Sequence, residues 1–432
     1  MVSHDAEVLI VGGGPAGAAA AFFLARAGCD VLLVDRATFP REKTCSEYLS
    51  PQASRLLHEM DVLDTLEAGP SARLTGMRVH APDGTVFQGS FSAVTGYRAF
   101  RDYGLAIRRP ILDTALLRRA EGAGARIRTD VDVRDLARDA KGRVTGVLAR
   151  QGTAQLTFQA RLVIGADGLR SVVARRAKLG AHGRWPRRLA LVRHFRGVTH
   201  DAPVGDMHVF EGGYAGFAPV GDGLTNVAVV IPTRQSRCIG NDRDAIMRQL
   251  LSSQPGPAAR VAKAEPVTPT RAIGPFNWRA RRAWTPGAVL VGDAADFFDP
   301  FTGEGIYAAM RGAELLSSYA WEAVRATNAH DADIALAAYD RCRKHEFGGK
   351  WSVERAIATA IASPPIINRA AHGLAQRSEL ADLLVGVTGD FVPARTVLKP
   401  QYALRLLAAA LLTNRTKVSS RLPAGSYRVA EP

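Results

Sequence analysis

The feature that most constrains the fold is a glycine-rich turn, GGGPAG at residues 12–17, between two short apolar segments. Residues 7–11 (EVLIV) precede the turn, and residues 18–27 continue from it with the pattern of a helix. A second apolar segment, residues 30–34, then ends at Asp35. A buried strand, a tight turn, a helix and a second buried strand in this order predict a βαβ unit with parallel strands.

Each glycine of this turn has a physical reason. Gly12 allows the tight turn, Gly14 lets the backbone approach a pyrophosphate, and Gly17 permits close packing of the helix on the strand. The helix N-terminus offers unpaired N–H groups to a phosphate. Asp35, 18 residues after Gly17, is placed to accept hydrogen bonds from a ribose hydroxyl. The unit therefore predicts a dinucleotide site, and the acid favours FAD or NAD over NADP there.

Two later segments repeat the arrangement of an acid after a strand. Residues 162–164 lead into GADG, and residues 289–291 lead into GDAA, followed by a Gly-rich loop at residues 300–306. Either segment alone is typical of an ordinary turn. The three signatures in this order resemble the FAD-dependent group A aromatic hydroxylases and the geranylgeranyl reductases, which share a fold with the flavin halogenases. The resemblance covers residues 5–325.

The resemblance implies FAD as the cofactor and NAD(P)H as the electron donor. It places Arg109 near the pyrophosphate, Asp167 at the flavin nucleotide and the nicotinamide approach, and Asp293 on the ribityl chain. A Gly-rich turn that leads into a helix N-terminus also suits the flavin edge where negative charge develops on reduction. The residues expected to contact FAD are Gly12, Gly14, Pro15, Ala16, Gly17, Asp35, Arg36, Cys45, Arg109, Val133, Asp167, Gly292, Asp293, Pro300, Thr302, Gly303, Glu304, Gly305 and Ile306.

Three segments bear on the branch of this family. FPREKTCSEYLSP (residues 39–51) is similar to the geranylgeranyl reductases, and so is DPFTGEGI (residues 299–306). Cys45 is either a functional thiol near the flavin, the one candidate catalytic residue, or a small buried residue that packs under the cofactor. GYAGFAP (residues 213–219) has Gly216 where the halogenases and lipid reductases carry Trp. That difference argues against halogenation and weakens the case for a prenyl-lipid substrate.

The fold class predicted is α/β, with a Rossmann-type parallel sheet, an antiparallel sheet and a helical C-terminal region. We expect a discontinuous FAD-binding domain (residues 1–75, 100–180 and 283–330), a substrate domain (residues 76–99 and 181–282) and the helical region (residues 331–432). The substrate domain contains short alternating segments with turns between them. Its candidate pocket residues, for each of which core packing is the alternative, are Met207, Phe210, Tyr214, Phe217 and Phe276.

Composition excludes several classes of protein. No run of about 18 apolar residues occurs, so we expect no transmembrane helix. The four cysteines are widely spaced, which predicts neither zinc nor disulfides and suits the cytoplasm. The net charge of +15 comes from scattered Arg, which indicates solvated faces and not a nucleic-acid site. The segment at residues 402–412, with basic residues around it, either contacts a membrane surface, caps the pocket or packs on the core.

Neither a catalytic triad nor a metal cluster can be argued from the sequence, and in flavoenzymes the cofactor carries the chemistry. The leading hypothesis is an NAD(P)H-dependent monooxygenase, a hydroxylase or epoxidase, that acts on a small hydrophobic or aromatic metabolite. The rival is a reductase of carbon–carbon double bonds. A non-enzymatic alternative, a flavin-binding module at a membrane surface or on a partner, rests on the basic charge alone. The oligomeric state is left open.

Overall fold

A parallel sheet forms around β1, as the glycine-rich unit predicts. The structure is a computed structural model, and it describes residues 4–92, 94–236 and 242–412. Ile10 of β1 lies opposite Ile164 on one side and Leu33 on the other, both in parallel register. The strands, in spatial order, are β20 (Trp284–Thr285), β21 (Ala288–Leu290), β11 (Ala154–Gly165), β1 (Ala6–Val11), β2 (Val31–Val34) and β8 (Arg126–Arg128), with β10 (Val144–Gln151) and β9 (Asp132–Arg138) joined through β11. Strands β20, β10 and β9 pair antiparallel with their neighbours, and the others pair parallel.

Helices cover this sheet because its central strands are buried and apolar on both faces. Helix α1 (Pro15–Arg26) has Pro at its first position, where the missing N–H costs no hydrogen bond. It packs against α4 (Arg109–Gly122) and α9 (Gly305–Arg325). The run of alanines at residues 18–21 is almost fully buried, so the neighbouring elements approach α1 closely. The carboxyl ends of β1, β2, β11 and β21 therefore share one edge of a rigid sheet.

The second large sheet is antiparallel except for the parallel pair β14 and β5. Its inner face, with Ala190, Met207 and Tyr214, joins the core of the parallel sheet, whereas Leu191 and Phe217 belong to a separate cluster on the outer face. This alternation follows the two-residue period of strands. The strands, in order, are β17 (Glu265–Pro266), β13 (Arg188–Arg196), β16 (Leu224–Pro232), β15 (Gly213–Pro219), β14 (Gly205–Phe210), β5 (Gly76–His80) and β6 (Val86–Ser90), with β18 (Arg271–Ile273) on β13.

Two small sheets and several short helices connect these parts. One small sheet contains β12 (Gly180–His182), β19 (Trp278–Ala280) and β22 (Asp296–Phe297). The other contains β3 (Tyr48–Leu49), β7 (Gly104–Ala106) and β4 (Ala72–Leu74). The short helices are α2 (Ala53–Glu59), α3 (Leu63–Ala68), α5 (Val172–Arg176), α6 (Thr233–Ser236), α7 (Arg243–Ser252), α8 (Pro255–Val261) and the 3-10 turns η1 (Gly292–Ala294) and η2 (Pro300–Thr302). Cys29, Cys45 and Cys342 are free thiols, and Cys238 lies outside the described residues.

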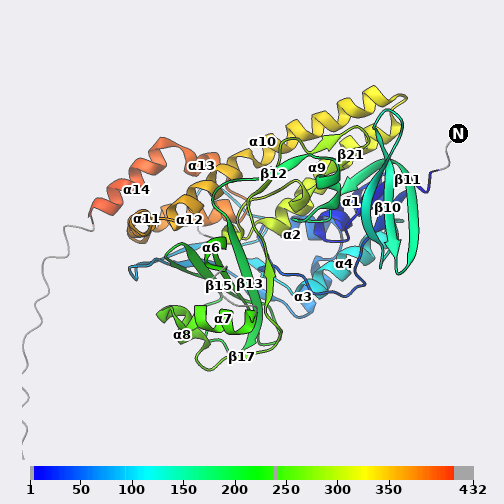
Figure 1. Ribbon diagram of the computed structural model, residues 1–432. Coiled ribbons are helices and arrows are strands. Elements are labelled where there is room, and N and C mark those ends of the chain that lie inside the picture. Colours follow the sequence, from blue (N-terminus) through cyan, green and yellow to red (C-terminus); the bar gives the residue numbers. More distant parts are fainter. Residues whose placement is uncertain (1–3, 93, 237–241, 413–432) are drawn as a thin grey trace, which may run out of the picture.

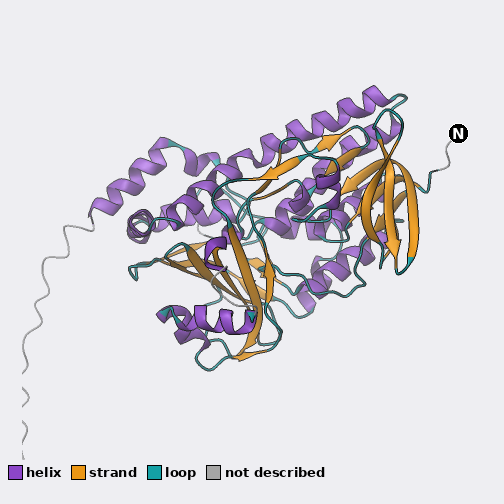
Figure 2. Cartoon of the chain, viewed as in Figure 1, coloured by secondary structure: helices purple, strands orange, loops and turns teal. Residues whose placement is uncertain are grey.

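The C-terminal region is helical, as expected. Helix α10 (Ala329–Ile361) runs along the molecule from the end that carries β10 to the end that carries α14 (Figure 1). The Pro pair at residues 364–365 begins a new helix, because Pro cannot continue the hydrogen-bonding of α10. The remaining helices are α11 (Pro364–Gln376), α12 (Ser378–Thr388), α13 (Arg395–Leu398) and α14 (Pro400–Leu412), which cluster at one end (Figure 2). Among the described helices, none has the length and apolar character needed to cross a bilayer.

Candidate functional site

A cavity of about 440 Å³ lies where the three sequence signatures meet. Every residue predicted to contact FAD lines it, with the exception of Gly17. The lining comes from the carboxyl ends of β1, β2 and β11, from the segment after β21, and from the start of α9. This is the edge of an open α/β sheet at which ligands bind. Contact between these residues and a cofactor stays a prediction.

The glycine-rich turn shows which glycines serve the fold and which faces the cavity. Gly12 has a φ of 105°, and a Cβ there would lie 2.5 Å from the carbonyl oxygen of Ala166. A Cβ on Gly17 would lie 1.8 Å from the carbonyl oxygen of Gly12. At Gly14, in contrast, a Cβ would meet only the guanidinium nitrogens of Arg41 and Arg109, at 3.7 and 3.8 Å. Gly14 therefore keeps a space open in front of two cations, which suits a pyrophosphate.

Asp35 closes the same turn from the end of β2. Its Oδ2 atom accepts a hydrogen bond from the backbone N–H of Gly13 at 2.6 Å, and its Oδ1 atom accepts from the N–H of Ala37 at 2.8 Å. Each carboxylate oxygen has a second lone pair. The side chain lines the cavity, so these lone pairs suit a ribose hydroxyl.

Basic side chains dominate the cavity around Gly14. Arg109 forms a bidentate pair with the buried Asp113, and Arg41 lies 3.2 Å from the same carboxylate. Burial opposes the charge of Arg109, but Asp113 and Cys45 raise the pKa of this guanidinium above its usual value. Burial and the charges of Arg109 and Arg41 lower the pKa of Lys43. The three basic side chains would therefore gain from an anionic ligand, and a pyrophosphate fits here. Sequence reasoning missed Arg41 and Lys43, although both stand in the quoted segment at residues 39–51.

Two acids flank this basic region. Asp167 accepts a hydrogen bond from the N–H of Val172 at 2.6 Å through Oδ2, whereas its buried Oδ1 atom has no hydrogen-bond partner among the described residues. Burial raises the pKa of Asp167. Burial also raises the pKa of Asp293 to about 6, against the opposing charges of Lys43 and Arg109. Both acids line the cavity, where a hydroxyl or amide donor would satisfy them.

The loop before α9 has the geometry expected of a flavin-ring contact. Asp299 caps η2 by accepting a hydrogen bond from the N–H of Phe301 at 3.1 Å. Gly303 has a φ of 74°, and a Cβ there would lie 2.7 Å from the ring of Tyr48. Glycine is therefore required at this position, and the first backbone N–H groups of α9 follow it. The residues present thus fit FAD along the whole cavity.

A buried ionisable cluster on the cavity wall was not anticipated. Lys350 of α10 has its Nζ atom 3.8 Å from Oε1 of Glu304 and also contacts Asp390. Glu354 lines the cavity one helical turn further along α10. Burial lowers the pKa of Lys350 and raises that of Glu304. Burial, with Glu304 and Asp299 nearby, raises the pKa of Glu354 well above its usual value. We call Glu304, Lys350, Glu354 and Asp390 the lysine cluster.

Helix α10 supplies this wall through one face. The residues that line the cavity are Tyr339, Arg343, Phe347, Lys350, Trp351 and Glu354. Their spacing of three to four residues was the available sequence signal. It was overlooked because Arg, Lys and Glu on a helix are typical of a solvated face.

Cys45 lies on the same cavity beside a fully buried acid, Glu47. The backbone N–H of Glu47 lies 3.4 Å from the Cys45 sulfur. The Glu47 carboxylate accepts hydrogen bonds from the N–H of Arg109 at 2.9 Å and from Nδ2 of Asn226 at 3.0 Å, and it lies 2.7 Å from Nε2 of His194. This arrangement fixes the segment that carries the thiol. A catalytic role of the thiol stays a prediction.

The five candidate substrate residues are not brought together. Phe276 lines the large cavity. Met207 and Phe217 line a separate pocket of about 50 Å³, next to Pro300 and Gly303. Phe210 and Tyr214 line neither of these two cavities. Tyr214 is instead buried, with its hydroxyl donating to Asp299 at 2.7 Å, and Phe210 packs on the outer cluster of the second sheet.

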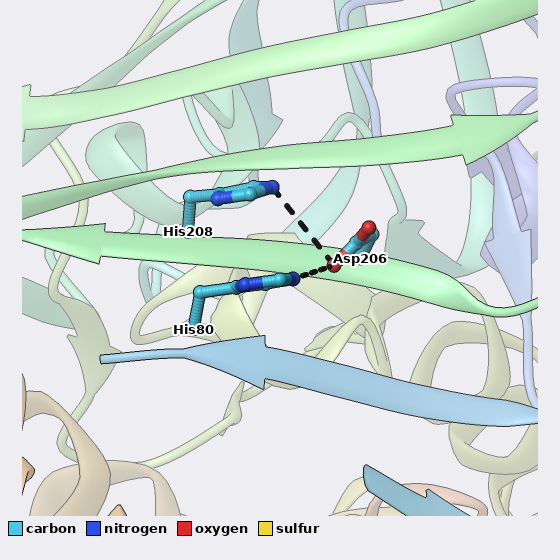
Figure 3. Close-up of side chains that lie close together, drawn as sticks. All are labelled: His80, Asp206 and His208. Atoms are coloured by element: carbon cyan, nitrogen blue, oxygen red, sulfur yellow. Dashed lines mark hydrogen bonds and ion pairs between the residues drawn. The ribbon is translucent and has the colours of Figure 1, made fainter. Parts of the chain in front are cut away.

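His80, Asp206 and His208 converge on the outer part of the second sheet, as Figure 3 shows. The Nε2 atoms of His80 and His208 lie 2.8 and 3.9 Å from the Asp206 carboxylate, and the two imidazole rings stack at 4.1 Å. Arg78 pairs with the same carboxylate at 2.8 Å, and Arg260 also contacts it. Burial and the neighbouring His80 lower the pKa of His208 to about 4. Two guanidinium groups already neutralise the acid, so the cluster is better suited to an ion-pair network than to a cation.

Comparison with known proteins agrees with this geometry. The model of the family described as FAD binding domain matches residues 5–345. Menaquinone reductase of Mycobacterium tuberculosis is 32% identical over 335 residues, 73% of this chain and 78% of the relative. Digeranylgeranylglycerophospholipid reductase 2 of Methanopyrus kandleri is 28% identical over 89% of this chain and 93% of the relative. Among solved structures, the flavin-dependent brominase Bmp2 has a TM-score of 0.80 at 17% identity, covering 96% of this chain and 100% of the brominase.

The structural neighbours confirm the α/β fold class. They include further flavin-dependent halogenases and PqsL, called a probable FAD-dependent monooxygenase. The inference from Gly216 against halogenation therefore has no support from these comparisons. Sequence matches, cavity residues and fold lead to one assignment: the chain belongs to the FAD binding domain family of flavin-dependent oxidoreductases.

Proposed function

We propose that this protein is an FAD-dependent reductase that saturates a carbon–carbon double bond of a hydrophobic substrate. The observation that carries the proposal is the lysine cluster on the cavity wall. It contains three carboxyl groups, Glu304, Glu354 and Asp390, around the single ammonium group of Lys350. So much negative charge in a buried place is stable only if at least one carboxyl group holds a proton at neutral pH.

A protonated acid is what such a reduction needs. When bound and reduced, FAD supplies a hydride, which adds to one carbon of the double bond. The neighbouring carbon must then take a proton, so that two hydrogens are added and the bond is saturated. Glu354 or Glu304 donates that proton, and Lys350 stabilises the carboxylate that remains. Cys45, on the same cavity, is the third candidate donor.

Other residues of the cavity bind the cofactor. Arg41, Lys43 and Arg109 hold the pyrophosphate beside Gly14, and Asp35 accepts from the ribose. Asp293 accepts from a hydroxyl of the ribityl chain. The named activities of two curated relatives, a menaquinone reductase and a phospholipid reductase, support reduction and point to a lipid-like substrate. NAD(P)H is the proposed electron donor.

A second candidate is the monooxygenase that the sequence first favoured. The pocket of about 50 Å³ beside Pro300 and Gly303 favours it, because a small pocket next to the flavin loop suits a compact ring better than a long chain. Oxygen insertion needs little from the protein beyond orientation and exclusion of water. The two candidates differ in whether product formation consumes oxygen.

The experiment that decides between them is an anaerobic single turnover. The bound flavin is reduced without oxygen and mixed with a menaquinone or a geranylgeranyl phospholipid, and products are identified by mass. A product that is formed in the absence of oxygen, and that stays heavier by two hydrogens after any quinol has been reoxidised to the quinone, supports the reductase. A product that appears only after oxygen is admitted, and that contains its oxygen atom, would overturn the reductase in favour of the monooxygenase.

A further inference from the structure

Helix α14 exposes a leucine stripe, which consists of Leu404, Leu407 and Leu411. These side chains are 65%, 51% and 54% exposed. Their spacing of three and four residues puts them on one face of the helix. Such a row of large exposed apolar side chains on a well-formed helix indicates an interaction surface.

The opposite face of α14 is fixed to the rest of the protein. The hydroxyl of Tyr402 donates to the carbonyl oxygen of Leu380 on α12 at 2.9 Å. Leu406 lies against Gly373 of α11, where a Cβ would lie 2.5 Å from the Leu406 carbonyl oxygen. The helix is therefore held rigidly, with the leucine stripe outward, at the end of the molecule shown in Figure 1.

The segment of the sequence that carries the stripe has charged residues of one sign only. Between Arg395 and Arg421 the sequence contains no acidic residue and six basic residues, which are Arg395, Lys399, Arg405, Arg415, Lys417 and Arg421. The last three lie outside the described residues. Arg405 pairs with Glu379 of α12 at 3.1 Å, whereas no ion pair is recorded for Arg395 or Lys399 within the part of the chain that the structure describes. An apolar stripe within an acid-free basic segment matches an anionic surface with an apolar interior.

We propose that the leucine stripe, together with Arg395 and Lys399, seats this protein on the surface of an anionic phospholipid bilayer. The leucines enter the boundary between headgroups and acyl chains, and the basic residues contact lipid phosphates. A second copy of the chain is a poorer occupant, because a twofold interface would place the same basic segment against itself. The proposal does not depend on the reaction, but a bilayer would be the source of a lipid-like substrate.

The test is flotation of the full-length FAD-loaded protein with vesicles. Vesicles of phosphatidylglycerol and phosphatidylcholine are compared with vesicles of phosphatidylcholine alone. We expect binding to the anionic vesicles that weakens as salt is added. In L404E/L407E, half-maximal binding should need about tenfold more lipid or more, because charged groups replace two inserted leucines.

The matched control adds the same two charges elsewhere. Leu148 of β10 and Ile334 near the start of α10 are 42% and 51% exposed, at the opposite end of the molecule (Figure 1). L148E/I334E should bind anionic vesicles as the unchanged protein does. The proposal is overturned if the unchanged protein does not float, or if L404E/L407E floats equally well. It is also overturned if the unchanged protein is a dimer in solution that L404E/L407E converts to a monomer without any vesicle binding. The FAD absorbance of each variant separates these outcomes from loss of the cofactor.

Discussion

Glu47 and His194 are 147 residues apart in the sequence, yet Oε2 of Glu47 lies 2.7 Å from Nε2 of His194. Glu47 is fully buried and has a φ of 62°. Its carboxylate also accepts from the backbone of Arg109 and from the side chain of Asn226. One acid therefore joins the segment that carries Cys45 to the start of α4 and to the second sheet. The cavity depends on this junction, because its walls come from both sides of it.

Replacing Glu47 by Ala should destabilise the protein by about 3 to 5 kcal/mol, because three buried polar partners lose a charged acceptor. Urea unfolding of the cofactor-free protein measures this free energy. FAD should also bind less tightly, since Arg109 and Cys45 lose their fixed positions. Glu121→Ala, at an exposed position of α4, is the matched control and should change stability by less than about 0.5 kcal/mol. Equal midpoints for the two variants would contradict the role given to Glu47.

The three cofactor signatures could be predicted from the sequence because each lies within one short segment. A strand, a turn with forced glycines and a helix N-terminus lie within a few residues of one another. Gly12 and Gly303 have backbone conformations that favour glycine, so the residue type itself indicates a turn at each position. The strands of the second sheet were also readable from their alternation and turns, although the parallel pairing of β14 with β5 was not.

What escaped prediction depends on contacts between distant segments. Lys350 and Glu354 stand in a long helix, and their spacing was overlooked because charged residues on a helix are typical of a solvated face. In the sequence, no pattern distinguishes Glu47 and His194 from other polar residues, and only the fold brings them together. The candidate residues Phe210 and Tyr214 illustrate the converse, since an inward position on a strand ends in the core more often than in a pocket.

The glycine-rich turn offers a paired prediction. Gly14→Ala should fold normally, because a Cβ there meets nothing closer than 3.7 Å, but FAD should bind about 100-fold more weakly because the methyl group occupies space for the pyrophosphate. Gly17→Ala should lose stability by about 3 kcal/mol or more, since its Cβ would overlap the Gly12 carbonyl oxygen. Fluorescence titration with FAD and thermal unfolding of the cofactor-free proteins separate the two effects. A Gly14→Ala protein with unchanged FAD affinity would argue against the site.

Asp293 makes the stability of the cofactor-free protein depend on pH. Burial raises its pKa from the usual 3.8 to about 6, so the folded chain holds this proton more tightly than the unfolded chain. The resulting stabilisation is fully present below about pH 4 and is lost as pH rises through 6. It amounts to about 2 kcal/mol, given partial exposure at the cavity wall. In Asp293→Asn this part of the pH dependence should disappear, whereas Asp102→Asn, at an exposed position, should keep it. Urea unfolding between pH 4 and pH 7 provides the curves, and identical curves for all three proteins would refute the assignment.

Glu354 allows a direct test of proton donation from the lysine cluster. Burial raises the pKa of Glu354 well above its usual value. Only the protonated carboxyl group donates, so the rate of substrate reduction should fall as pH rises through that pKa. Glu354→Gln should lower the anaerobic single-turnover rate by about 100-fold and remove this pH dependence, while FAD affinity stays unchanged. Glu346→Gln is the control on the same helix, because Glu346 pairs with Arg311 at 2.9 Å and does not line the cavity. If Glu354→Gln keeps the rate and pH profile of the unchanged protein, the proton comes from another group, and Cys45→Ser, measured in the same way, then shows whether the thiol supplies it.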